Sequence, residues 1–158
     1  MNLLERVQNL LCQMGVTAEY RAEDLTTFIS TGPIGSRLKI REGHGYLKCI
    51  VLIPIFVPEY RRFAMAEALS RANFSLNTGT FEMDWEDGEM RFRSAMPVID
   101  AEPTDEQLRC LVLGAWNTAA RYMTALIEVA FTDIDPETAI DRAEASWKEE
   151  QQQAVVER

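Results

Sequence analysis

The chain has 158 residues, of which 47% are hydrophobic, and its net charge is −9. This length fits one domain with a well-buried core. The longest apolar run, Cys49 to Pro58, is shorter than the roughly 20 residues that cross a bilayer. Residues 101–158 carry 12 acidic and 5 basic residues, and an acidic chain repels phosphate backbones. These features argue against a membrane or a nucleic acid as a partner.

The N-terminal residues MNLLER lack the basic region and apolar stretch of a secretory signal, so we expect a cytoplasmic protein. Cys12, Cys49 and Cys110 are widely spaced and form no zinc-binding pattern. Each lies in an apolar context, which predicts three reduced and buried thiols.

The first half of the chain predicts one helix, three strands and a second helix. Asn2 and Glu5 form a capping box for the first helix. Residues 25–31, 37–41 and 46–53 have the composition of strands, and the unbroken apolar run in the third predicts a central position. Prolines at 54 and 58 end that strand. The second helix then starts at Pro58, with a predicted buried stripe of Phe63, Ala66, Leu69 and Ala72.

A β-hairpin is predicted over residues 81–96, with Asp87-Gly88 as a two-residue type I′ turn. In this register apolar residues face each other on one side and opposite charges on the other. The predicted facing pairs are Trp85 with Met90, Met83 with Phe92, Asp84 with Arg91, and Glu82 with Arg93.

The longest predicted helix spans residues 105–131 and begins with a capping box of Thr104 and Gln107. It carries two apolar stripes, whereas a helix on a sheet needs one. The second stripe comprises Leu113, Trp116, Ala120, Met123, Ile127 and Phe131. Such a stripe needs a packing partner, which is either a second subunit or the terminal helix. The sequence does not decide between these two. That terminal helix starts at Pro136, and residues 148–158 are polar on all sides, so we expect them to fray.

The predicted fold class is therefore α+β, in the order α-β-β-β-α-β-β-α plus a C-terminal helix, with helices packed on an antiparallel sheet. Residues 1–158 form a single domain in this interpretation.

Three segments carry a family resemblance: Arg71 to Phe74, Gly79 to Asp84, and Asp87 to Arg93. They resemble the central signature of the YbjN-like family, and the resemblance covers roughly residues 45–142. That family is similar in fold to type III secretion chaperones. The resemblance implies a small, acidic, usually dimeric protein that binds other polypeptides, in a family whose members are described as sensory transduction regulators. It supplies no catalytic residue, and Ala120 stands where relatives have an acidic residue before the Arg-Tyr pair.

The sequence predicts no enzyme, no cofactor and no metal site. His44 is the only histidine and lies between two glycines in a predicted turn, where a solvated side chain is the simpler interpretation. A histidine-based zinc site needs more than one imidazole.

Arg37, Lys39 and Arg41 alternate along one strand, with Lys48 as a candidate neighbour. Such a basic strip is a solvated face or an edge guard, or it binds an anionic ligand or the acidic tail of a neighbouring copy.

The leading hypothesis is a non-enzymatic, chaperone-like or regulatory module that acts as a homodimer and holds a partner polypeptide. The predicted partner-binding residues are apolar and come from the proline-bounded segment and the second stripe: Ile55, Phe56, Val57, Trp116 and Met123. The alternative is a small-molecule sensor whose pocket lies between the sheet and the long helix. Its predicted lining is Tyr46, Trp85, Phe92 and Tyr122.

Overall fold

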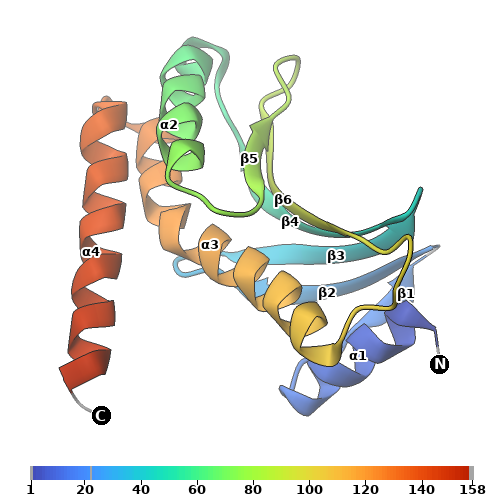
Figure 1. Ribbon diagram of the computed structural model, residues 1–158. Coiled ribbons are helices and arrows are strands. Elements are labelled where there is room, and N and C mark those ends of the chain that lie inside the picture. Colours follow the sequence, from blue (N-terminus) through green and yellow to red (C-terminus); the bar gives the residue numbers. More distant parts are fainter. Residues whose placement is uncertain (1, 22, 157–158) are drawn as a thin grey trace.

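The computed structural model describes the backbone of residues 2–21 and 23–156 (Figure 1). The elements follow one another as α1 (Leu3–Gln13), β1 (Glu19–Arg21), β2 (Asp24–Ser30), β3 (Gly35–Gly43), β4 (Tyr46–Phe56), η1 (Glu59–Arg61), α2 (Arg62–Phe74), β5 (Thr80–Met83), β6 (Glu89–Pro97), α3 (Asp105–Phe131) and α4 (Pro136–Val156). The α+β class is confirmed, and the short strand β1 is an addition to the predicted order.

The six strands form one antiparallel sheet in the order β1-β2-β3-β4-β6-β5. Strand β4 lies between β3 and β6, as its apolar run predicted. The β3–β4 connection turns at His44 and Gly45, which both have positive φ, as a type I′ turn requires.

The helices lie on one side of the sheet (Figure 1). On this inner face the strand side chains are buried, as Leu47, Val51 and Phe92 show. Most side chains of the opposite, outer face are exposed or half-buried, as Lys48, Ile50 and Leu52 on β4 show, whereas Asp24 and Thr26 on β2 are buried there. Helix α4 packs against α2 and α3 and forms a further layer on the helical side.

Strand β4 continues past its predicted end at Ile53. Pro54 is exposed on the outer face, and the pairing with β6 shifts between Ile53 and Phe56. Proline lacks an N–H donor, so it is tolerated where the ladder is irregular.

The β5–β6 hairpin has a different register from the predicted one. Met83 faces Met90, Phe81 faces Phe92 and Glu82 faces Arg91, so each pairing differs by two residues. A type I′ turn needs positive φ at both central residues, whereas Gly88 alone has it in this turn. The side chains of Asp84 and Asp87 instead accept bonds from the N–H groups of Glu86 and Glu89, and a longer turn results.

Helix α2 starts after the 3₁₀ turn η1, and this shifts its buried side. Met65, Ala68, Leu69 and Ala72 are buried, whereas the predicted core residue Phe63 is 80% exposed. Both predicted capping boxes are confirmed, at α1 and at α3.

Helix α4 runs to Val156, and the fraying of residues 148–158 stays a prediction; residues 157–158 lie outside the described residues. Lysine, glutamate and glutamine are good helix formers, which agrees with the helical assignment. The prediction of three buried thiols is wrong for two of them: Cys49 is buried, but Cys12 and Cys110 are exposed. Their apolar neighbours face the core while these two side chains lie on the outer sides of α1 and α3.

Candidate protein-binding surface

The predicted segment around Phe56 lies at the end of β4, and its side chains alternate between the two faces. Ile55 and Val57 are buried in the core at 8% and 1% exposure, whereas Phe56 is 59% exposed. Strand geometry explains the difference, because successive side chains point to opposite faces. Phe56 is therefore the member of this segment that a partner can touch.

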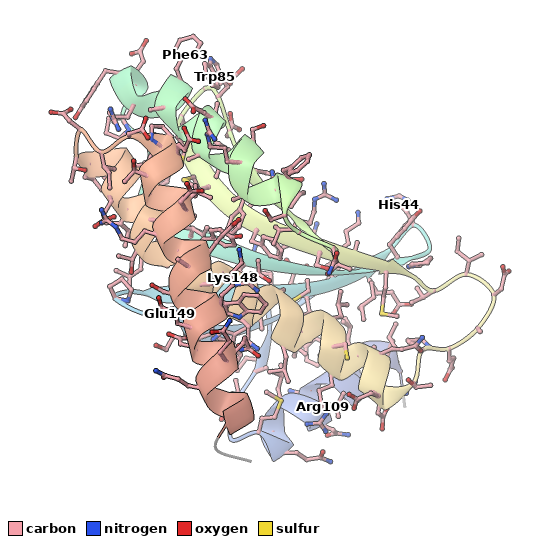
Figure 2. The ribbon with its side chains drawn as sticks, turned by 60° about the vertical axis from the view of Figure 1, so that its left-hand side comes forward. His44, Phe63, Trp85, Arg109, Lys148 and Glu149 are labelled. Carbon is pink, nitrogen blue, oxygen red and sulfur yellow. The ribbon has the colours of Figure 1, made fainter. Side chains whose placement is uncertain are left out.

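Phe56 belongs to a group of exposed aromatic side chains at one end of the sheet. Tyr60 is 79% exposed, Phe63 80% and Trp85 48%. Phe63 and Trp85 meet edge to face with their ring centroids 5.1 Å apart, and Figure 2 shows the pair at one end of the molecule. We call Phe56, Tyr60, Phe63 and Trp85 the aromatic patch. A hollow of about 390 Å³ adjoins it, lined by Glu82, Met83, Asp84, Trp85, Glu89 and Arg91.

Hydrogen bonds join the two chain segments that carry the patch, the β4–α2 connection and the β5–β6 hairpin tip. The Val57 N–H donates to the Gly88 carbonyl at 2.9 Å. The Arg62 guanidinium donates to the carbonyl oxygens of Trp85 at 2.9 Å and Glu86 at 3.2 Å, and to that of Val57 at 3.3 Å. The hairpin tip is therefore held against the start of α2.

Sequence reasoning missed three members of the patch, each for a local reason. Tyr60 lies in the 3₁₀ turn, Phe63 was assigned to the wrong side of α2, and Trp85 was assigned to a ladder position. The signal that was present is the crowding of aromatic residues on both sides of Pro58.

The other two predicted residues lie on α3, away from the patch. Trp116 is half-buried and donates its indole N–H to the Ser30 carbonyl at 2.6 Å, so it fixes α3 to the end of β2. Met123 is fully buried. Helix α4 meets α3 where Trp147 stacks on Arg121 at 4.1 Å and Glu144 accepts a bond from the Tyr122 hydroxyl at 3.0 Å, and Ala120 of the predicted second stripe lines a hollow there with Trp147.

One side of α3 is left partly open. Leu113, Trp116, Ala120 and Ile127 are half-buried, and Phe131 is 53% exposed. They recur at helical spacing on one side of α3, and we call them the α3 stripe.

The residues of the alternative small-molecule pocket are not brought together. Phe92 and Tyr122 are buried and both contact the Phe81 ring, with centroids 4.8 and 5.4 Å away. Tyr46 and Trp85 are exposed, and Tyr46 pairs with Pro97 at the far end of β6 from the hairpin tip. The four side chains therefore line no common cavity.

The groups considered for chemistry are scattered. His44 is exposed at the β3–β4 turn, at the opposite end of the sheet from the aromatic patch (Figure 2). Burial raises the pKa of the Cys49 thiol to about 12, so this thiol stays protonated and unreactive near neutral pH. Within residues 2–21 and 23–156, no three His, Cys, Asp or Glu side chains are grouped to hold a metal ion.

Basic side chains gather on the outer face of the sheet. Asp24 is 5% exposed; it pairs with Arg41, whose Nη2 is 2.9 Å from Oδ2, and with Lys39 at 3.6 Å. The hydrogen bond from Arg41 holds the pKa of the Asp24 carboxyl below its usual range. Glu82 pairs in the same way with Arg91 at 2.6 Å and with Arg93.

This arrangement defines an α+β domain with helices on one face of an antiparallel sheet and a charged, uncovered outer face. The model of the family YbjN, described as "Putative bacterial sensory transduction regulator", matches residues 3–128. The chain belongs to the YbjN family.

A solved structure of YbjN from E. coli, described as a putative transcription regulator, has a similar fold with a TM-score of 0.60. The two are 16% identical, and the similarity covers 80% of this chain and 91% of the other. A search of curated proteins gives no match. None of the described helices combines the length and the apolar character that a membrane span needs.

Proposed function

We propose that this chain is a non-enzymatic regulatory module that acts as a homodimer and binds a partner polypeptide at the aromatic patch. The observation that carries the proposal is the exposure of four large aromatic side chains at one end of the sheet. Exposed aromatic side chains gathered at one end of a domain are typical of interaction sites, where aromatic residues are enriched. The family's description as a regulator agrees with a binding role. The cytoplasmic location stays a prediction.

Loss of the patch is expected to release the partner. The variant Phe63→Ser with Trp85→Ser removes the edge-to-face pair, whose side chains are exposed, so the fold should persist. A tagged wild-type chain should retain a polypeptide that this variant loses, as judged by co-purification and mass spectrometry. Truncating such anchors typically costs about 2 kcal/mol or more of binding, roughly a thirtyfold loss.

Phe74→Ser is the matched control, because Phe74 is 93% exposed at the other end of α2. It should retain the same polypeptide as the wild-type chain. If the patch variant also retains it, the patch is not the binding surface.

The α3 stripe supports the homodimer, because its apolar side chains are only partly covered within one chain. Light scattering should therefore give the mass of a dimer for the wild-type chain. Ile127→Glu with Phe131→Glu places charges in this surface and should give the mass of a monomer, since burying an unpaired charge costs several kcal/mol. Phe74→Glu should stay dimeric. A wild-type chain that is monomeric at all concentrations would contradict the dimer.

A further inference from the structure

The outer face of the sheet carries the opposite charge to the molecule as a whole. Alternate residues of the ladder place seven basic and four acidic side chains on it, namely Arg21, Arg37, Lys39, Arg41, Lys48, Arg91 and Arg93 with Glu19, Asp24, Glu82 and Glu89. The chain overall has a net charge of −9. The acidic excess therefore lies elsewhere, and it is concentrated in residues 101–158, which include α3 and α4.

The carboxylates of this face do not neutralise it. Asp24 is shared by Arg41 and Lys39, and Glu82 is shared by Arg91 and Arg93, so each group keeps one excess positive charge. Arg37 lies over the Phe28 ring, 5.3 Å from its centroid. Within the described part of the chain, no carboxylate forms an ion pair with Arg37 or with Lys48.

Apolar side chains lie among these cations. Ile50 and Leu52 are half-buried between the basic residues of β3 and those of β6, which face them across the ladder. Phe28 is 68% exposed on β2. Phe56, a member of the aromatic patch, is the last residue of β4 and pairs with Glu89 of β6. The outer face therefore borders the aromatic patch at this end of the sheet.

We propose that the outer face of the sheet binds an acidic, partly apolar segment of the partner polypeptide, with the carboxylates of that segment on the basic residues of β3, β4 and β6. This inference rests on the proposed function and adds the chemistry of the partner. A polypeptide supplies carboxylates and aliphatic side chains together, which matches the mixed character of the face. A nucleic acid supplies phosphates without aliphatic groups and so leaves Ile50, Leu52 and Phe28 without an apolar partner.

The test measures fluorescence anisotropy of a fluorescein-labelled 12-residue peptide in which glutamate and leucine alternate, added to the full chain at about 0.1 M ionic strength. Arg37→Glu with Lys48→Glu should weaken binding at least about tenfold, because cations facing the peptide become anions. Neither substitution breaks an ion pair within the described chain. The melting temperature of this variant should therefore stay close to that of the wild-type protein.

Arg109→Glu with Lys148→Glu is the matched control. These residues lie on α3 and α4, away from the outer face, and the substitutions change the net charge by the same amount (Figure 2). This variant should bind the peptide within about twofold of the wild-type chain, because exposed charges beyond a Debye length of roughly 10 Å are screened.

Equal weakening in both variants would overturn the proposal, because net charge alone would then explain it. Equal binding of a peptide with lysine in place of glutamate, or of a single-stranded oligonucleotide in place of the peptide, would overturn it as well. If the glutamate peptide does not bind but the patch variant still loses its partner, this inference fails and the proposed function stands. If the peptide binds normally but the patch variant keeps its partner, the patch assignment fails instead.

Discussion

Gly88→Ala is expected to lower the free energy of unfolding by about 3 kcal/mol. Gly88 has a φ of +81°, which a residue with a Cβ adopts at a cost. A Cβ built there also meets the carbonyl oxygen of Val57 and lies 2.8 Å from its nitrogen. These atoms are backbone and belong to the contact that holds the hairpin tip, so the tip must move. Chemical denaturation followed by tryptophan fluorescence measures the loss, and Trp85 reports on the tip.

Gly15→Ala separates the two causes. Gly15 has nearly the same φ, +77°, but a Cβ built there meets nothing within 4 Å. We expect this control to cost only the conformational part, about 1–2 kcal/mol. Equal losses in the two variants would show that the Val57 contact has no weight in holding the hairpin.

Tyr122→Ala is expected to cost about 3–5 kcal/mol, the range for removing a buried aromatic side chain. Tyr122 is fully buried, its ring packs edge to face on Phe81, and Phe81 packs in turn on Phe92. The side chain therefore joins α3 to β5 and β6. Tyr122→Phe keeps the ring and removes the hydroxyl with its bond to Glu144, so its cost should be about 1 kcal/mol, as denaturation measures it. A loss in Tyr122→Phe as large as in Tyr122→Ala would show that the hydroxyl, not the ring, stabilises this junction.

The wild-type protein and Tyr122→Phe also test the environment of the Tyr122 hydroxyl at high pH. Burial, with help from Glu144, raises the pKa of Tyr122 to about 12, whereas in the unfolded chain it is near 10. A raised folded-state pKa contributes stability that is complete below the unfolded value and is lost as the pH rises through the folded value. The wild-type protein should therefore lose more stability than Tyr122→Phe between about pH 10 and 12. Parallel curves for the two proteins would contradict this assignment.

The helix starts were predictable because the determinants are local. Asn2 with Glu5, and Thr104 with Gln107, are capping boxes in the sequence and in the structure. Pro136 opens α4 with Asp135 before it, whose side chain accepts a bond from the Thr138 N–H at 3.0 Å. Such signals need only a few neighbouring residues.

The hairpin register was not predictable from side-chain pairing. A shift of two residues keeps every side chain on its own face, so Phe81, Met83, Met90 and Phe92 stay together in either register. The turn decides between the two, and it depends on Gly88 meeting Val57, a contact between distant parts of the chain.

The aromatic patch was only partly predictable for a related reason. Helical spacing places Phe63 in the core if α2 begins at Pro58, but the 3₁₀ turn over Glu59–Arg61 rotates the helix and exposes it. Ile55, Phe56 and Val57 were chosen as one segment, and only strand alternation separates the exposed Phe56 from its buried neighbours. Whether Trp116 and Met123 contribute to partner binding stays a prediction.

The layering of the helices has a consequence for how chains of this architecture diverge. The family match ends at residue 128 and α4 begins at Pro136, while the packing partners of α4 are two other helices rather than the strands. Shortening, lengthening or exchanging α4 therefore leaves every rung of the β-ladder in place. Ala139 and Ile140 of α4 are buried in the core, so a replacement helix must keep that contact while its outward side is free to change.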